Sequence, residues 1–217
     1  MYFVRHGETE GNLGQYYQTS ETPLTEAGHQ GAQAVAERFT HIDINIIIAS
    51  PFMRAQQTAA HISKALDIPV ITSEYFHEVK NAVHIRGVRF GTEEAEKYNT
   101  ERTANFLNPK WCPEGAENYF DVSKRIECGI KILEENEYEN IVVVSHGHFL
   151  RSFIARLLLD KHDEPKTNRI ISESLITMSN VGITEFVYKE DKWRLFTWND
   201  HAHFAEYLKS VIVSCMI

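Results

Sequence analysis

Cysteine is scarce in this sequence: Cys112, Cys128 and Cys215 are the 3 thiols among 217 residues. Their odd number and wide spacing exclude the disulfide framework that stabilises many small secreted domains. They also exclude a zinc site built from paired thiols. We therefore expect a protein of the reducing cytoplasm.

An excess of basic residues is also missing, since Asp and Glu (30) outnumber Lys and Arg (22) and give a formal net charge of −8. A general nucleic-acid binder needs the opposite balance to displace counterions from phosphates. We therefore expect no nucleic-acid partner, and an anionic ligand would have to be held by a local cluster of positive side chains.

Long apolar runs are absent as well. A run such as 44–49 contains the polar Asn45, and it falls far short of the roughly twenty residues that span a bilayer. Near the amino terminus, Arg5 and His6 come too early to leave room for an export signal. These absences predict a cytoplasmic protein that has no membrane partner.

The remaining composition is that of an ordinary globular protein. Hydrophobic residues make up 43% and charged residues 24% of the chain, with 11 Gly and 6 Pro, which excludes a collagen-like or disordered chain. The length suits one domain of good size. We expect a single domain over residues 1–217, with an insertion at about 74–113, where the periodic pattern blurs.

Short apolar runs alternate with amphipathic segments along the chain. The runs at 2–4, 44–49 and 140–145 predict buried strands. Two β-rich runs around the polar turn 189–192 predict a hairpin. The fold class predicted from this alternation is α/β: a three-layer α/β/α sandwich with a mostly parallel sheet, in which the insertion lies over the carboxyl ends of the strands.

Two helix starts can be predicted from local signals. Ser50 followed by Pro51 is typical of an N-cap and a first-turn proline, which predicts a helix that runs to about Leu66. Apolar residues at spacings of three and four predict a second, longer helix that opens at Glu114.

Polar side chains follow three of the predicted strands. They are Arg5 and His6, then Ser50 with Arg54 shortly after it, and then His146 and Gly147. Ligands of α/β proteins bind beyond the carboxyl ends of the strands, so we expect these side chains to meet at one edge. The planar guanidinium of arginine matches the oxygens of a phosphate, which predicts a phosphate site.

Four segments carry a resemblance to a known family, and they occur in order between residues 1 and 151. They read Arg5-His6-Gly7-Glu8-Thr9 with Asn12, Pro23-Leu24-Thr25-Glu26-Ala27-Gly28, Ser50-Pro51-Phe52-Met53-Arg54-Ala55 through Thr58-Ala59, and Val144-Ser145-His146-Gly147. Together they resemble the motifs of the histidine phosphatase superfamily, to which the phosphoglycerate mutases and fructose-bisphosphatase domains belong.

The resemblance implies that His6 is the nucleophile that takes a phosphoryl group on a ring nitrogen. It also implies that Arg5 and Arg54 bind the phosphoryl oxygens and that His146 completes the pocket. A neutral imidazole can attack phosphorus without a separate base, since its ordinary pKa is about 6.5. Arginines supply the positive charge that phosphoryl transfer needs, so we expect neither a metal ion nor a cofactor.

The leaving oxygen needs a proton, and one carboxyl group can give it and later accept a proton from water. Our candidate is Glu78, which lies where the family's donor glutamate usually follows a strand and a short loop. The Gly-x-Trp-Glu-Gly segment that often follows in mutases is replaced here by residues 80–86. Glu8 is the alternative donor.

Further binding residues follow from the same resemblance. It implies that Asn12 hydrogen-bonds the phosphate and that Gln18 and Gly147 also contribute to the substrate site. A basic stretch in the insertion is either a solvated loop or a clamp on the substrate, and it contains Lys80, His84, Arg86 and Arg89.

Two other features have less specific interpretations. We interpret His148, and the pair His201 and His203, as satisfied or exposed histidines rather than metal ligands, because no third ligand is placed by sequence. The apolar segment 211–217 is expected to be a strand or tail docked on the core, and a partner contact is the alternative.

These observations predict a phosphatase that hydrolyses phosphomonoesters through phosphohistidine and whose partner is a phosphorylated small molecule. The alternative is a phosphoglycerate mutase, and a third possibility is a non-catalytic phosphate-binding module. The missing tryptophan-containing segment after Glu78 favours the phosphatase over the mutase. Neither the substrate nor an oligomeric state is specified by the sequence.

Overall fold

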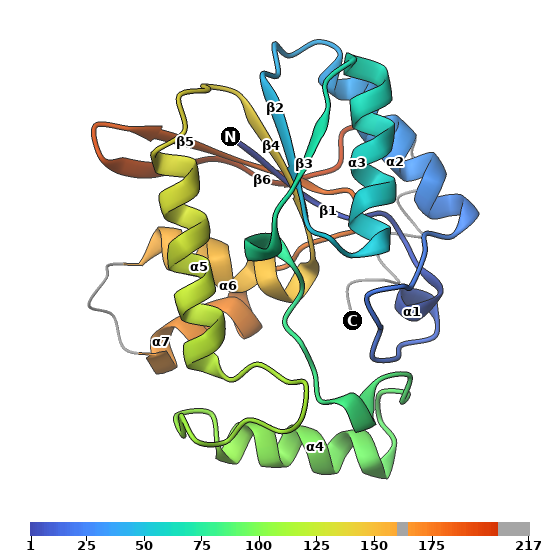
Figure 1. Ribbon diagram of the computed structural model, residues 1–217, viewed down its shortest axis with the longest axis vertical. Helices are drawn as coiled ribbons and strands as arrows, with labels where there is room; N and C mark the ends of the chain where they lie inside the picture. The colour runs from blue at the N-terminus through green and yellow to red at the C-terminus, as the bar shows by residue number, and fades with distance from the viewer. Residues whose placement is uncertain (160–164, 204–217) are drawn as a thin grey trace.

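The computed structural model describes residues 1–159 and 165–203, and its centre is a six-stranded sheet with the order β3-β2-β4-β1-β5-β6 (Figure 1). The strands are β1 (Tyr2–Arg5), β2 (Ile46–Ala49), β3 (Val70–Thr72), β4 (Ile141–Ser145), β5 (Ile183–Lys189) and β6 (Lys192–Asp200). The first four strands run parallel, and the hairpin β5–β6 is added antiparallel to β1. The predicted mostly parallel sheet and the terminal hairpin are therefore confirmed.

Helices cover both faces of the sheet (Figure 1). They are α1 (Glu10–Leu13), α2 (Glu26–Phe39), α3 (Met53–Leu66), α4 (Glu93–Ala104), α5 (Tyr119–Glu134), α6 (Gly147–Leu158) and α7 (Pro165–Ile170). Alternate residues of β4 face opposite layers: Val142 and Val144 pack with α2 and α3, whereas Ile141 and Val143 pack with α5 and α6. This two-sided burial gives the predicted α/β/α sandwich.

Two helices begin later than the sequence predicts. The helix α3 starts at Met53 instead of Pro51, because the Ser50 hydroxyl bonds the ring of His146 and accepts from the N–H of Phe52 instead of capping a helix. The helix α5 starts at Tyr119 instead of Glu114, because Asn118 forms a capping box with Asp121. The predicted end of α3 at Leu66 is confirmed.

The segment between β3 and α5 lies beyond the carboxyl ends of the strands, with α4 farthest from the sheet (Figure 1). It contains two short 3-10 helices, η1 (Glu74–Phe76) and η2 (Val83–Ile85), besides α4. A small apolar cluster of its own joins it to the amino-terminal loop, with Tyr17 packed against Ala82, Ile85, Ala95 and Tyr98. This packing holds the segment over the edge of the sheet where the polar residues gather.

The register of the central strands brings the predicted site residues together. Arg5 pairs with Ser145 and Ala49 with Val144, and the ladder continues through hydrogen bonds from His6 N to Ser145 O and from Ser50 N to Val144 O. The residues that follow β1, β2 and β4 therefore leave the same edge side by side.

Within residues 1–159 and 165–203, no helix has the length and apolar character needed to cross a membrane. The apolar segment 211–217, for which a docked strand or tail was predicted, lies outside the described residues.

Candidate active site

The ring of His6, the predicted nucleophile, is fixed by its own loop. His6 is 2% exposed, and its Nδ1 lies 2.6 Å from the carbonyl oxygen of Gly7. Because a carbonyl oxygen only accepts, Nδ1 carries the ring hydrogen and Nε2 keeps its lone pair. The loop is anchored in turn by a hydrogen bond of 3.0 Å from Gly7 N to the Thr58 hydroxyl on α3.

Arg54 reaches the same ring from the first turn of α3. Its Nε donates to Nε2 of His6 at 3.1 Å, and its Nη1 donates to the carbonyl of Thr19 at 2.8 Å. Burial lowers the pKa of Arg54 to about 10, so the guanidinium stays charged at neutral pH. A fixed positive charge therefore faces the nitrogen that carries the lone pair.

Arg5, at the end of β1, donates from Nη1 to the carbonyl of Met178. Its guanidinium passes close to Gly147, where an added Cβ would lie 3.1 Å from Arg5 Nε and 3.3 Å from its Cζ. A Cβ at 147 would require the Arg5 side chain to shift by a few tenths of an ångström, so this glycine leaves room for the close approach of Arg5 to the site.

The ring of His146 lies next to the ring of His6, and their centroids are 5.1 Å apart. It is fully buried, and its Nε2 lies 2.7 Å from the Ser50 hydroxyl. Its Nδ1 is buried and has no hydrogen-bond partner within the described residues. Buried polar atoms are normally paired, so the unused ring nitrogen suits a group whose partner is a ligand, although His146 is not itself part of the wall of the cavity that contains His6.

Both histidines are held neutral. Burial and then the charges of Arg54 and Arg5 keep the pKa of His6 well below its ordinary value. Burial and then Arg54 act in the same direction on the pKa of His146. Neutral imidazoles therefore persist below neutral pH, which is the protonation state that a nitrogen nucleophile requires.

The two candidate donors lie in different surroundings. The Glu78 carboxylate lines the cavity that also contains His6, and it accepts from the backbone N–H of His148 at 3.2 Å and of Phe149 at 2.8 Å, in the first turn of α6. Glu8 is absent from the wall of this cavity, and its Oε1 accepts from the Thr25 hydroxyl at 2.8 Å. The structure thus brings Glu78, and not Glu8, to the site.

Asn12 and Gln18 both line the cavity, and the amide oxygens of both side chains accept hydrogen bonds from other protein groups. Asn12 Oδ1 accepts from Thr9 N at 3.1 Å and from Asn180 Nδ2 at 3.2 Å, and Gln18 Oε1 accepts from the Thr9 hydroxyl at 3.0 Å. Since the oxygens are used within the protein, the amide nitrogens are the groups through which both residues can donate to a ligand.

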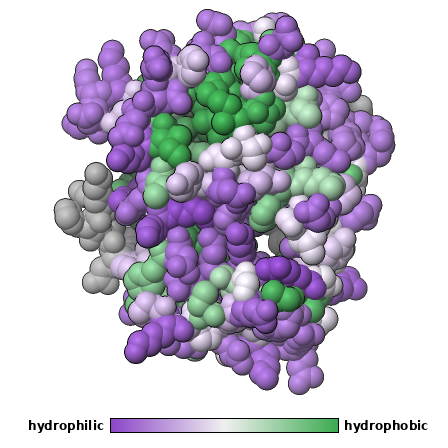
Figure 2. Space-filling view, in the orientation of Figure 1, coloured by the Kyte–Doolittle hydropathy of each residue, from purple (hydrophilic) through white to green (hydrophobic). Residues whose placement is uncertain are grey.

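The cavity around these residues has a volume of about 800 Å³ and is lined mainly by polar side chains. Figure 2 shows hydrophilic residues around the hollow between the sheet and α4. Arginines and lysines outnumber carboxylates in its wall: the first group is Arg5, Arg54, Lys80, Arg86, Arg102, Arg151 and Arg169, and the second is Glu78 and Glu173. The site is therefore a local positive region in an acidic chain.

Two of the four basic residues of the insertion face the cavity in the folded protein, and two do not. Lys80 and Arg86 line the cavity, whereas His84 and Arg89 do not. The His84 ring packs edge-on against Tyr98 at 5.7 Å. Half of this stretch can therefore contact a ligand.

Several residues of the site were not predicted from the sequence. Asn180 Nδ2 donates to the carbonyls of His6 at 2.9 Å and Gly7 at 3.0 Å, and Arg102, Arg151 and Arg169 enter the cavity from α4, α6 and α7. No local motif marks Asn180. Arg151 alone had a signal, because it lies one helical turn after Gly147 on the helix that follows a strand end.

The other histidines hold different positions. His148 lines the cavity, and burial and then Arg102 keep its pKa well below the ordinary value. His201 Nε2 lies 2.9 Å from the Ser179 hydroxyl, and His203 Nδ1 lies 3.4 Å from Arg38 Nη1. Within the described ranges, no three or more His, Cys, Asp or Glu side chains are grouped as metal ligands.

The chain is similar in sequence and in fold to several known proteins. The chain is 30% identical over 202 residues to a probable phosphoglycerate mutase GpmB of Yersinia pestis, covering 91% of this chain and 89% of the relative. A mycobacterial glucosyl-3-phosphoglycerate phosphatase complexed with VO3 is 25% identical with a TM-score of 0.74, covering 93% and 98% of the two chains. A phosphoserine phosphatase mutant from Entamoeba histolytica, in complex with phosphoserine, is 28% identical with a TM-score of 0.70, covering 94% and 98%.

The family model of the histidine phosphatase superfamily (branch 1) matches residues 1–201. That range contains all four sequence motifs and every residue of the cavity wall described above. The chain therefore belongs to the histidine phosphatase superfamily.

Proposed function

We propose that this protein is a phosphatase that hydrolyses phosphomonoesters through a phosphohistidine on Nε2 of His6. The observation that carries the proposal is the fixed tautomer of His6: Gly7 O holds the hydrogen on Nδ1, so the lone pair of Nε2 faces the Arg54 guanidinium. A neutral nucleophile beside a permanent positive charge suits attack on an anionic phosphoryl group.

In the first step, Nε2 forms a bond to phosphorus while the bond from phosphorus to the ester oxygen breaks. Arg5 and Arg54 bind the phosphoryl oxygens, and Arg54 Nε exchanges its bond to the ring for one to phosphate. His146 contributes through Nδ1, the ring nitrogen that the described protein leaves unused. Asn12 and Gln18 donate from their amide nitrogens.

Glu78 handles the protons of both steps in this proposal. Its carboxyl group gives a proton to the departing ester oxygen, which leaves as an alcohol. In the second step the carboxylate takes a proton from water as the water oxygen attacks phosphorus, and His6 and inorganic phosphate are released. The place of Glu78 in the cavity wall with His6 and Arg54 supports this assignment over Glu8.

The outer arginines favour a substrate that carries a second anionic group. Arg102, Arg151 and Arg169 come from three helices and lie near enough to His148 that all three lower its pKa, after the larger effect of burial. Glu173 pairs with Arg169 at 3.0 Å, whereas Nε of Arg151 is buried without a hydrogen-bond partner in the described chain. A carboxylate or a second phosphate on the leaving group would satisfy this charge.

A phosphoglycerate mutase is the second candidate, and it is favoured by the 30% identity to a probable phosphoglycerate mutase. The two differ in the acceptor of the second step, which is water for a phosphatase and a substrate hydroxyl for a mutase. With 3-phosphoglycerate and a bisphosphoglycerate primer, we expect release of inorganic phosphate to exceed isomerisation. Faster isomerisation would establish the mutase.

The proposal is tested by trapping the intermediate. The protein is mixed with a ³²P-labelled phosphomonoester and quenched within milliseconds, and the label is expected on His6 in an acid-labile, base-stable form. His6→Ala should carry no label and show no turnover. Label on a serine or cysteine would contradict this mechanism, and binding of phosphate without label or turnover would establish a non-catalytic module.

A further inference from the structure

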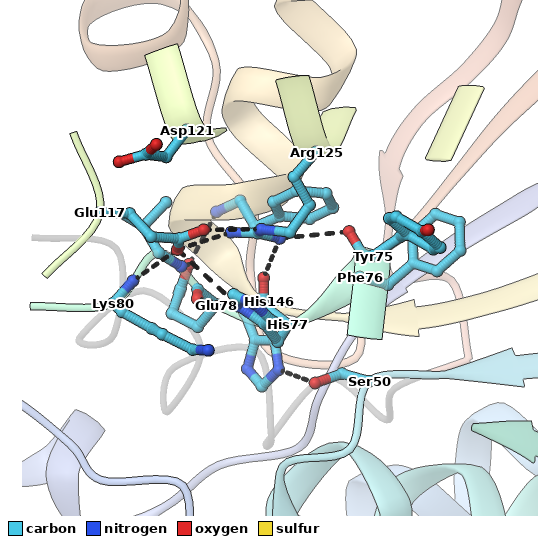
Figure 3. Close-up of polar contacts among 12 residues, drawn as sticks. Ser50, Tyr75, Phe76, His77, Glu78, Lys80, Glu117, Asp121, Arg125 and His146 are labelled. Carbon is cyan, nitrogen blue, oxygen red and sulfur yellow. Dashed lines mark hydrogen bonds and ion pairs between the residues drawn. The ribbon is translucent and has the colours of Figure 1, made fainter. Parts of the chain in front are cut away.

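The short segment that carries Glu78 has little regular structure of its own. Residues 77–80 lie between η1 (Glu74–Phe76) and η2 (Val83–Ile85). A carboxyl group that transfers protons must nevertheless be held within a fraction of an ångström of its partner atoms. The groups that fix this segment come from α5 and from the loop before it (Figure 3).

Arg125 of α5 holds the backbone on the amino-terminal side of Glu78. Its Nη1 donates to the carbonyl of Tyr75 at 3.1 Å and to the carbonyl of His77 at 2.8 Å (Figure 3). One nitrogen therefore binds two carbonyls on the amino-terminal side of Glu78.

Glu117 binds the backbone on the carboxyl-terminal side of Glu78, and it also binds the Arg125 side chain. Its Oε2 accepts from the backbone N–H of Lys80 at 2.9 Å. The same carboxylate pairs with Arg125 through both oxygens, Nε to Oε1 and Nη2 to Oε2, each at 2.8 Å. Burial alone would raise the pKa of Glu117, but the hydrogen bond and charge of Arg125 hold it below its ordinary value. The pair is therefore ionised at neutral pH.

The two sides are joined through Phe149. The Arg125 guanidinium lies 4.5 Å from the centroid of the Phe149 ring, and the backbone N–H of Phe149 donates to the Glu78 carboxylate at 2.8 Å. The residue that Arg125 packs against is thus one of the residues that bind the Glu78 side chain. The Arg125 guanidinium therefore helps to position both the backbone beside Glu78 and the Glu78 carboxylate.

Neither member of the pair is part of the cavity wall that contains His6. Both side chains are nearly buried, with exposures of 10% for Arg125 and 12% for Glu117. A buried ion pair contributes little net stability, because the loss of hydration offsets the attraction between the charges. Its value here lies in geometry, since the pair makes three hydrogen bonds to the backbone of one short segment.

We propose that Arg125 and Glu117 are positioning residues for Glu78, and that they hold its carboxyl group where it can protonate the leaving oxygen. This inference rests on the proposed function, in which Glu78 is the proton donor. It assigns the pair an effect on proton transfer and none on phosphate binding.

The test compares two substrates without a second anionic group, ethyl phosphate and p-nitrophenyl phosphate. Alkoxide is a poor leaving group and needs a proton, whereas p-nitrophenolate departs unaided. Arg125→Lys keeps the charge but not the paired contacts. It is expected to lower kcat for ethyl phosphate at least about tenfold, with a much smaller change for p-nitrophenyl phosphate and in either KM. Glu117→Gln should change the same ratio in the same direction.

A double-mutant cycle isolates the route through Glu78. In the Glu78→Gln background, Arg125→Lys should cause no further loss on ethyl phosphate, because the proton that the pair positions is gone. Arg156→Lys is the matched control, since Arg156 of α6 pairs with Glu127 of α5 at 3.8 Å and, within the described residues, makes no hydrogen bond or ion pair with residues 77–80. That variant should keep the wild-type ratio.

Equal losses on both substrates, or a further loss in the Glu78→Gln background, would overturn this inference. Near-UV circular dichroism checks that each variant is folded, and Glu117→Gln replaces Arg125→Lys if the latter is not. Failure of the proposed function gives a different result: Glu78→Gln itself would then leave the substrate ratio of the wild type unchanged.

Discussion

Nε of Arg54 donates a hydrogen bond of 3.1 Å to Nε2 of His6. The arginine comes from the first turn of the helix after β2 and the histidine from the residue after β1, so the contact joins two residues that are 48 positions apart in the chain. The contact orients the imidazole lone pair toward a cation, where a phosphoryl group would be bound.

Arg54→Lys tests this relationship. Lysine keeps one positive charge but loses the Nε donor and the planar pair of nitrogens that matches phosphate oxygens. We expect kcat/KM for p-nitrophenyl phosphate to fall by a factor of about 10² or more. Arg38→Lys alters an arginine that pairs with Asp200 away from the cavity, and it should keep the wild-type rate. Equal activity of the two variants would contradict a role for Arg54 in binding the phosphoryl group.

The buried histidines predict how stability depends on pH. Their pKa values in the folded protein lie well below the ordinary value of about 6.5. The unfolded chain therefore binds protons first, and the free energy of unfolding should decrease as pH falls below about 6.5. Urea titrations between about pH 7.5 and 5.5 measure the slope, and His146→Gln should reduce it. An unchanged slope would show that His146 is readily protonated in the folded state.

The leaving group distinguishes the two candidate donors. Glu78→Gln keeps the shape of the side chain and removes its proton, so hydrolysis of ethyl phosphate should fall at least about a hundredfold while that of p-nitrophenyl phosphate falls far less. Glu8→Gln is the matched control, because the Glu8 carboxylate bonds Thr25 outside the cavity wall. If Glu8→Gln shows the selective loss instead, the donor has been assigned to the wrong carboxylate.

The outer arginines predict a preference among alkyl phosphates. Wild-type protein should have a higher kcat/KM for 2-phosphoglycolate than for ethyl phosphate, since the two differ by a carboxylate. Arg151→Met should reduce that ratio about tenfold, as expected for one charge-assisted hydrogen bond. Lys131→Met removes an exposed charge of α5 that is not part of the cavity wall, and it should leave the ratio unchanged. A ratio near one in the wild type would argue against a second anionic group.

Chelation tests the expectation that no metal takes part. Arginines supply the positive charge that a divalent ion supplies in many phosphoryl-transfer enzymes. The initial rate after dialysis against excess chelator should therefore equal the untreated rate. A loss that one added divalent ion reverses would instead point to a metal in the reaction.

The local sequence determined the layers and placed the candidate nucleophile at a strand end. Ile141 to Val144 are apolar at every position, which is the pattern of a strand buried on both faces, and Arg5, His6 and His146 follow strands directly. These signals are short-range, because the alternation of side chains along a strand is a property of the backbone itself. The helix starts at Met53 and Tyr119 were harder to predict, since capping depends on which contact a side chain makes in the folded protein.

Only the tertiary structure placed Glu78, and not Glu8, in the wall of the cavity that contains His6, and brought Arg125 to the Glu78 segment. Glu8 lies within the first motif and Glu78 follows β3 after a short connecting segment, and the chemistry of the two side chains is the same. What separates them is that Glu78 meets the N–H groups of α6, 70 and 71 residues later, whereas Glu8 meets Thr25. Such contacts arise from the packing of distant elements, and the spacing of residues along the chain carries no signal for them.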